Sequence, residues 1–302
     1  MGNTILYTLL LVWVKILAVL PMRVLYFLSD IFYVLTRYIA RYRRKTVRKN
    51  MRQSFPDMTE KERKQLERRF YHHFSDYVVE TIKLAGISQQ ELLKRAQISN
   101  PEVVLDLLDR GHSTFIMLMG HYGNWEWFSG GAPFFENRVS LYQIYRPLKN
   151  KAFDRLFLYI RTRFHSVGIK KKEAVRDIFK LNRDNIPAIV IFIADQSPSI
   201  TNLEFWTNFL NQDSAIITGP ERIAKKLDLP VIFADVQKIK RGYYTVEFKL
   251  ITDQAKQIPD FEITAQYAQL MERCIKRDPA YWLWTHNRWK HPRPSNESLK
   301  PE

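Results

Sequence analysis

Apolar residues follow one another along the chain with spacings that indicate several helices. Thr59-x-x-Glu62 has the pattern of a capping box, which predicts a helix that continues to about Leu84 and stops at Gly86. Ser88-x-x-Glu91 predicts a shorter second helix in the same way. Gly219-Pro220 opens another helix, because proline suits the first helical position. Further helices are expected at about 151–164, 172–182 and 263–277.

The period of the pattern changes after Gly111. Residues 113–119, STFIMLM, form a continuous apolar run that is typical of a buried strand. Further strands are expected at 139–145 and 188–194, and a pair at 231–239 and 243–252 turns at Arg241-Gly242. Strands that alternate with helices predict an α/β fold with a mixed, largely parallel sheet flanked by helices. Ligands in such sheets usually bind beyond the carboxyl ends of the strands.

The N-terminal 36 residues are predicted to anchor the chain in a membrane. Residues 5–20 are apolar except for Thr8 and Lys15, and Pro21 and a second apolar stretch at 24–35 follow. The first run is slightly shorter than the roughly 20 residues of a spanning helix, and Lys15 would have to reach the headgroups. The alternative interpretation is a hairpin of helices in a protein core.

Positive charge is concentrated directly after this segment. The chain carries 47 Lys and Arg against 31 Asp and Glu, a net charge of +16. Residues 37–52, RYIARYRRKTVRKNMR, hold eight basic residues and no acidic one. Such a run suits nucleic acid or an anionic membrane surface, and the neighbouring apolar segment favours the membrane. No helix-turn-helix, RNA-recognition or zinc pattern is present, so no nucleic-acid partner is expected.

Composition excludes several kinds of site. A hydrophobic fraction of 46% with 14% aromatics supports a substantial core. The single cysteine, Cys274, rules out an internal disulfide and a cysteine-based zinc site. The seven histidines include no HExxH pair, and no GxxxxGK[ST] phosphate loop occurs. We therefore expect neither a metal nor a bound cofactor.

The segment Gly120-His121-Tyr122-Gly123-Asn124-Trp125-Glu126 begins where the strand at 113–119 ends. On a regular helix of 3.6 residues per turn, His121 and Glu126 would lie about 140° apart. They converge if His121 precedes a helix and Glu126 lies in its first turn, and the glycines permit that turn. The glutamate could then hold one imidazole nitrogen while the other takes a proton from a substrate hydroxyl. The alternative is a structural hydrogen-bonded pair.

This segment resembles a known family. His121-x4-Glu126 matches the HX4D/E motif of glycerolipid-type acyltransferases, and the GHYGNWE form is similar to the bacterial lipid A biosynthesis acyltransferases. The similarity extends over almost the whole chain and includes SFP at 54–56, YRP at 145–147, Arg161-x-Arg163, ADQ at 194–196, TGP at 218–220 and YWLW at 281–284. The chain departs from the family at Phe209-Leu210-Asn211, where a glycine commonly follows the aromatic residue.

The resemblance implies a membrane-associated O-acyltransferase with a glycerolipid acyltransferase-like fold. Such an enzyme moves a fatty acyl chain from acyl carrier protein or coenzyme A to a hydroxyl of a lipid A precursor. By resemblance, His121 is the general base and Glu126 its partner. Arg161 would stabilise the oxyanion or orient the acceptor, and Asp195 would support the site from another strand end. The substrate-binding candidates are Arg146, Asn124, Arg163 and Gln196.

The resemblance also divides the chain and places it in the cell. Residues 1–36 would be the membrane anchor, 37–58 a basic juxtamembrane segment and 59–302 the acyltransferase domain. The expected location is the bacterial inner membrane, with the catalytic domain on the cytoplasmic side. If the first helix spans, the basic run after it stays cytoplasmic.

Alternatives remain open for the activity and for single residues. The acceptor could be another lysolipid, glycolipid or aminolipid, and the same dyad could activate water in a thioester hydrolase, although no GxSxG elbow occurs. The alternative from a different class is a membrane-tethered basic protein that binds nucleic acid through the run at 37–52. Arg161 and Arg163 could be a solvated helix face, Asp195 a turn former and Arg146 the end of a strand. His72, His73 and His165 are expected at the surface and Cys274 in the core. Trp282, Trp284 and Trp289 are expected to be packing residues and interfacial anchors.

Overall fold

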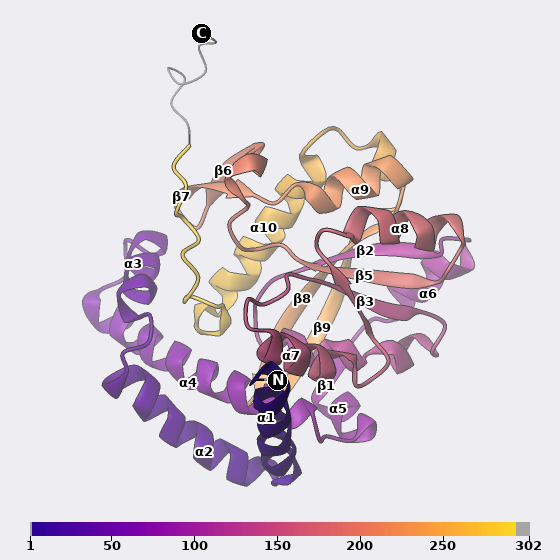
Figure 1. Ribbon diagram of the computed structural model, residues 1–302. Coiled ribbons are helices and arrows are strands. Elements are labelled where there is room, and N and C mark those ends of the chain that lie inside the picture. Colours follow the sequence, from indigo (N-terminus) through magenta and orange to yellow (C-terminus); the bar gives the residue numbers. More distant parts are fainter. Residues whose placement is uncertain (1, 294–302) are drawn as a thin grey trace.

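The computed structural model describes residues 2–293 (Figure 1). Its helices are α1 (Gly2–Val19), α2 (Met22–Val34), a π-helical turn η1 (Leu35–Ile39), α3 (Arg44–Ser54), α4 (Glu60–Leu84), α5 (Gln89–Arg95), α6 (Glu102–Asp109), α7 (Lys151–Thr162), α8 (Ala174–Arg183), α9 (Gly219–Leu227) and α10 (Glu262–Arg277). Short 3₁₀ helices include η2 (Trp125–Gly130), η3 (Ala132–Phe135), η4 (Ile200–Asn202), η5 (Ala255–Gln257) and η6 (Pro279–Tyr281). The last residues of the predicted domain, 294–302, lie outside the described part of the chain.

A seven-stranded sheet forms the centre of the molecule. Its strands lie in the order β1-β9-β8-β2-β5-β3-β4. They are β1 (Ala96–Ile98), β2 (Thr114–Met119), β3 (Ser140–Tyr145), β4 (Val167–Lys170), β5 (Ala188–Ile193), β8 (Val231–Lys240) and β9 (Tyr243–Thr252). Every neighbouring pair is parallel except β8 and β9, which form an antiparallel hairpin. The predicted mixed, largely parallel sheet flanked by helices is therefore confirmed.

The strands with the strongest apolar signal lie at the centre of this sheet. All six residues of β2 are buried, and β5 beside it begins with four buried residues. Helices on both sides exclude water from these strands, which is why their apolar runs are continuous rather than alternating. The sequence did not predict β1 and β4, whose three and four residues are too short for a clear pattern.

A small antiparallel hairpin lies apart from the main sheet. It consists of β6 (Phe205–Phe209) and β7 (Gln212–Ile216). Its turn residues Leu210 and Asn211 have φ angles of 53° and 58°, in the left-handed region that glycine adopts without strain. The missing glycine of the sequence motif is thus accommodated by a strained turn in which the Leu210 side chain is fully buried.

Predicted helix starts are confirmed for α4 and α5. The Thr59 side chain accepts a hydrogen bond from the backbone N–H of Glu62, whose carboxylate in turn accepts from the Thr59 backbone N–H at 2.7 Å. Ser88 caps α5 by accepting from the Glu91 backbone N–H at 3.2 Å. These caps satisfy N–H groups that no helical carbonyl reaches, so each helix starts at a defined residue.

Helices α2, α3 and α4 form an arc along one side of the sheet, and α1 lies beside α7 (Figure 1). The carbonyls of Ala18 and Leu20 at the end of α1 accept hydrogen bonds from Lys83 Nζ on α4 at 2.8 and 2.9 Å. Gly86 allows this close approach, since a Cβ there would lie 2.7 Å from the Ala18 carbonyl oxygen. The end of α1 is therefore attached to the α/β domain.

The N-terminal helices combine features of both sequence interpretations. Val14 and Ala18 pack in the core, and Lys15 Nζ lies 5.7 Å from the centre of the Tyr159 ring on α7. Most of α1 is nevertheless exposed and apolar, including Leu9 and Trp13. Of the described helices, α1 alone is long and apolar enough to cross a membrane. Length and composition of one terminal helix are weak evidence for a span.

Candidate active site

Parallel pairing of β2 and β5 brings together two side chains that are 74 residues apart in the chain. Met119 at the end of β2 lies opposite Ile193 at the end of β5. His121 and Asp195 each follow two residues later, so both emerge at the same edge of the sheet. This edge is the carboxyl end of the strands, where α/β folds usually bind their ligands.

Asp195 is the carboxylate that holds the His121 imidazole. His121 Nδ1 lies 2.7 Å from Asp195 Oδ1, and the backbone N–H of His121 donates to Asp195 Oδ2 at 2.9 Å. The prediction that Glu126 makes this contact is wrong. Because the Nδ1–H donates to Asp195, the Nε2 lone pair is the one left to accept a proton.

Two aromatic side chains complete the surroundings of this pair. The Trp282 indole N–H donates to Asp195 Oδ2 at 2.7 Å, so three N–H groups converge on one carboxylate. The Trp125 ring packs edge-on against the imidazole, with ring centres 4.9 Å apart. The orientation of His121 is therefore fixed by a hydrogen bond on one side and by packing on another.

Glu126 forms a buried ion pair with Arg161 of α7. The guanidinium reaches both carboxylate oxygens, with Nε 2.8 Å from Oε2 and Nη2 2.5 Å from Oε1. The Trp125 indole N–H adds a third hydrogen bond to Glu126 at 3.2 Å. As predicted, Glu126 lies in the first turn of a helix that His121 precedes, and Gly123 with φ of 62° makes the turn between them.

Both carboxylates of the site are ionised over the range in which an imidazole can act as a base. Burial by itself would raise the pKa of Asp195, but the charge of His121 and three hydrogen bonds lower it below its ordinary 3.8. Burial likewise opposes ionisation of Glu126, and Arg161 outweighs it, so the pKa of Glu126 lies below 4.5. Each carboxylate thus provides a fixed negative charge beside its own partner, the His121 imidazole or the Arg161 guanidinium.

His73 of α4 supports the loop between His121 and Glu126. Its Nε2–H donates to the Gly123 carbonyl at 3.2 Å, and its Nδ1 accepts from Lys238 Nζ at 3.2 Å. The expectation that His73 lies at the surface is wrong, since it is 5% exposed. His72 and His165 are exposed as predicted, and Cys274 is buried as predicted.

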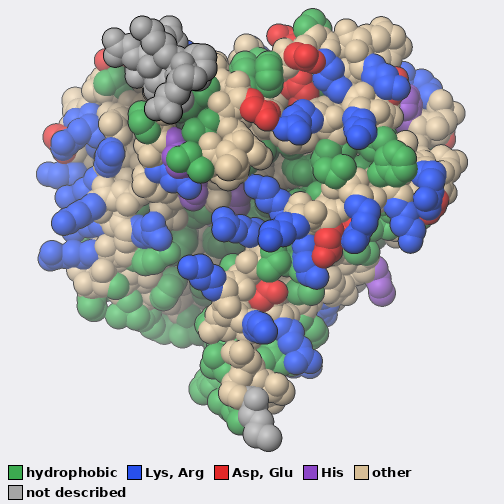
Figure 2. All heavy atoms as spheres, turned by 45° about the horizontal axis from the view of Figure 1, so that its top comes forward, with side chains coloured by type: hydrophobic (Ala, Val, Ile, Leu, Met, Phe, Trp, Pro, Cys, Tyr) green, Lys and Arg blue, Asp and Glu red, His purple; other side chains and the backbone are tan. Residues whose placement is uncertain are grey.

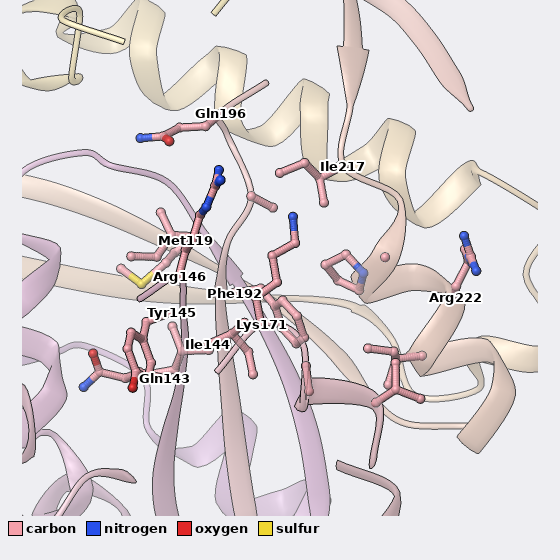
Figure 3. Close-up of a pocket in the computed structure, with 18 of the residues that line it drawn as sticks. Met119, Gln143, Ile144, Tyr145, Arg146, Lys171, Phe192, Gln196, Ile217 and Arg222 are labelled. Carbon is pink, nitrogen blue, oxygen red and sulfur yellow. The ribbon is translucent and has the colours of Figure 1, made fainter. Parts of the chain in front are cut away.

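A cavity of about 970 Å³ opens beside His121 (Figures 2 and 3). Six cationic side chains line it, and within the described residues no carboxylate does. They are Arg146, Arg161, Lys171, Arg176, Arg222 and Lys226. Figure 2 shows basic side chains around a hollow in this face of the molecule. Such a rim attracts phosphate or another anionic group of a substrate.

Apolar side chains form another part of the cavity wall. They come from β3, β5, α8 and α9 and from the segment after β7, and they include Ile144, Val175, Phe179, Ile191, Ile193, Ile217, Ile223 and Leu227. Figure 3 shows the labelled apolar residues Ile144, Phe192 and Ile217 around the same cavity as Arg146 and Gln196. A cavity of this size with an apolar wall and a charged rim suits an amphipathic ligand.

The structure brings five of the predicted site residues to this cavity and leaves three out. His121, Arg161, Arg146 and Gln196 line it, and Asp195 reaches it through His121. Gln196 Nε2 lies 3.4 Å from His121 Nε2, beside the position that an acceptor hydroxyl would take. Glu126 acts behind Arg161.

Asn124 and Arg163, two of the predicted substrate-binding residues, do not line the cavity. Asn124 is fully buried and donates to Glu80 Oε2 at 2.8 Å, in a cluster that also holds the Tyr244 hydroxyl. Arg163 Nη1 donates to the backbone carbonyls of Leu84 and Ile87 after the end of α4. Both side chains stabilise the scaffold, because the carbonyls at a helix C-terminus and a buried carboxylate require donors.

Sequence reasoning missed Trp282 as a residue of the site. It was assigned to packing, and the sequence contains no signal for its bond to a carboxylate 87 residues earlier. Its position follows from the backbone of residues 281–284, because Leu283 N–H donates to the His121 carbonyl and Tyr122 pairs with Trp282. Within residues 2–293 no three His, Cys, Asp or Glu side chains are grouped so that they could ligate a metal ion.

We predict that acid weakens the fold partly through His286. Burial lowers the pKa of His286 to about 4 from 6.5. A depressed folded-state pKa means that the unfolded chain binds a proton first, so stability is full above pH 6.5 and is lost as the pH falls towards 4. His286→Gln should reduce this acid-induced loss in the free energy of unfolding by about 1–2 kcal/mol, a figure that allows for solvent screening at this partly exposed side chain.

The measurement is the melting temperature in detergent between about pH 7 and pH 4 for both proteins. His165→Asn is the matched control, because His165 is exposed and asparagine tolerates its φ of 65°. Equal pH dependence of wild type and His286→Gln would contradict the assignment.

Comparison with known proteins adds independent information about the whole chain. The family model described as bacterial lipid A biosynthesis acyltransferase matches residues 2–291. A relative from Escherichia coli (strain K12), named lipid A biosynthesis lauroyltransferase, is 23% identical over 275 residues. That alignment covers 90% of this chain and 87% of the relative.

Proposed function

The chain belongs to the bacterial lipid A biosynthesis acyltransferase family, and from this premise we propose that it transfers a fatty acyl chain from a thioester to a hydroxyl of a lipid A precursor. Family membership makes it a membrane-associated transferase. The donor, the acceptor hydroxyl and the roles of individual residues belong to the proposal. The observation that carries it is a carboxylate-held imidazole at the mouth of a cavity with an apolar wall and a cationic rim.

The first chemical step begins at His121 Nε2. This atom takes the proton of the acceptor hydroxyl while the oxygen attacks the thioester carbonyl carbon. The imidazolium that forms is stabilised by Asp195, which remains an anion. The carbon–sulfur bond then breaks, the imidazolium returns its proton to the leaving thiolate, and the products are an ester and a free thiol.

The oxyanion formed during attack requires donors on the cavity side of His121. Arg161 lines the cavity and keeps a partly exposed side chain although it pairs with Glu126. The ion pair fixes the guanidinium in place, and preorganised charge stabilises a developing anion without reorganisation. Burial opposes the charge of Arg161, but Glu126 raises the pKa of the guanidinium, so it stays cationic throughout.

The cavity lining supports a lipid acceptor that carries anionic groups. Arg146 and Lys171 lie on the same side of the cavity in Figure 3, and neither makes an ion pair within the described residues. Phosphate esters and the phosphopantetheine of acyl carrier protein or coenzyme A are both anionic. We infer that the acyl chain occupies the apolar wall while anionic groups remain at the rim. The proposed location is the cytoplasmic side of the inner membrane.

The test is a matrix of donors and acceptors with the purified full-length protein, read by product mass. Lauroyl and longer thioesters of acyl carrier protein and coenzyme A are combined with the Kdo-lipid A precursor and with lysophospholipids. We expect one acyl chain to be added to the lipid A precursor, with release of one thiol. Transfer to lysophospholipids alone would assign the enzyme to another lipid, and thiol release without an acylated product would indicate a hydrolase.

A further inference from the structure

A second hollow of about 390 Å³ lies on α3 and α4, away from the candidate active site. We call it the basic groove. It is lined by Arg37, Arg44, Arg48, Lys61, Lys64, Gln65 and Arg68, and no acidic side chain of the described chain lines it. None of these residues lines the large cavity, and the proposed reaction uses none of them. Figure 2 shows basic side chains along the left edge of the molecule, the side on which α3 lies in Figure 1.

The groove is a built feature and not only a set of surface lysines. The carboxylate of Glu67, which is 2% exposed, receives Arg44 Nε at 2.9 Å and Arg48 Nε at 2.7 Å. Arg37 is 6% exposed, and its Nε has no hydrogen-bond partner although Glu67 Oε1 lies 3.7 Å away. One carboxylate cannot neutralise three guanidinium groups. The groove therefore carries an excess of positive charge that an anion would balance.

Apolar side chains lead directly to this groove. On α2 and η1, exposed apolar residues recur at helical spacing, at Phe27, Ile31, Leu35 and Tyr38. Phe27 is 65% exposed, and Arg37 of the groove immediately precedes Tyr38. An apolar helix face that ends in a cluster of Arg and Lys is the arrangement of a surface that lies in the boundary between acyl chains and headgroups.

We propose that the basic groove binds the phosphate of an anionic phospholipid in the membrane in which α1 and α2 are embedded. The exposed apolar row beside the groove favours a lipid over a soluble acidic protein as the partner. In a membrane these apolar side chains can enter the acyl-chain region, whereas a soluble acidic protein on the groove would leave them in water. The phosphate would accept hydrogen bonds from the Lys and Arg side chains that line the groove, foremost the α4 cations Lys61, Lys64 and Arg68. This contact orients the domain on the membrane surface and is independent of the chemistry at His121.

The test removes the three α4 cations together, as Lys61→Gln, Lys64→Gln and Arg68→Gln. All three are exposed and make no ion pair in the described chain, so the fold should be retained. The matched control is Lys94→Gln, Lys180→Gln and Lys256→Gln, which removes the same charge from exposed positions elsewhere. Binding of the full-length proteins to vesicles is measured by flotation at increasing salt.

All proteins should bind phosphatidylcholine vesicles equally through the apolar helices. On vesicles that also contain phosphatidylglycerol, wild type and control should bind more tightly, and the groove variant should lose about 10- to 100-fold of that gain. Equal losses in variant and control would show diffuse charge attraction and overturn the proposal. Groove-dependent binding of inorganic phosphate or acyl carrier protein, with no difference on anionic vesicles, would overturn it as well.

Discussion

Replacing His121 by alanine is expected to lower kcat for acyl transfer by about 10²–10⁴-fold, the usual contribution of a positioned general base. The KM for the acyl donor should change little, because the imidazole acts on the acceptor proton in the transition state. In the unsubstituted protein only Nε2 of this ring can accept the hydroxyl proton, because Nδ1 is bonded to Asp195 at 2.7 Å. The measurement is product mass against time with purified variants.

The control for this experiment is His165→Asn, which changes an exposed histidine outside the cavity. Circular dichroism and melting temperature establish that the His121→Ala protein is folded. A folded His121→Ala protein with a near-native rate would rule out His121 as the base, and another group would then have to accept the hydroxyl proton.

The fold was predictable where local patterns coincide with tertiary structure. Residues 115–119 are all apolar because β2 lies between two other strands and is covered on both faces. Capping residues at Thr59 and Ser88 fixed two helix starts without any distant contact. Helix α3 was hidden because five of its eleven residues are basic and only two of its four buried residues, Val47 and Met51, are apolar.

The contact that orients the base was not predictable from the sequence. Glu126 is five residues from His121, and this proximity favoured it as the partner. Only the register of β2 against β5 shows that Asp195 reaches the imidazole. A similar limit applies to His73. The sequence predicts a surface position, because the Gly123 carbonyl that it contacts belongs to a residue 50 positions away in the chain.

The two carboxylates of the site therefore have separate tasks. Asp195 holds the imidazole, and Glu126 holds the Arg161 guanidinium at the cavity wall. Each is buried, and the pKa of each is lowered by the charges and hydrogen bonds of its own partners, so neither can exchange partners without leaving a buried carboxylate unpaired. The HX4E segment thus carries both His121, the proposed base, and Glu126, which holds the proposed oxyanion donor Arg161 at the same cavity. His121 and Glu126 are not hydrogen-bonded to each other.

This division predicts different losses for two conservative substitutions. Asp195→Asn should lower kcat by about 10²–10⁴-fold with little effect on stability, because an amide can hold the imidazole in the wrong tautomer. Glu126→Gln should destabilise the fold by about 3–5 kcal/mol, because Arg161 then lacks a buried counter-ion. Rates and melting temperatures of both variants, measured side by side, separate the two effects.

Trp282→Phe serves as the graded control, since it removes one of three donors to Asp195 and keeps most of the ring volume. Loss of one hydrogen bond to a charged group corresponds to about 1.5–3 kcal/mol, so kcat should fall by roughly 10- to 100-fold. If Glu126→Gln instead lost the pH-dependent base activity while Asp195→Asn retained it, the two assignments would be reversed. The observed hydrogen bonds favour the assignment of Asp195 as the orienting carboxylate, because His121 Nδ1 lies 2.7 Å from Asp195 whereas Glu126 binds Arg161.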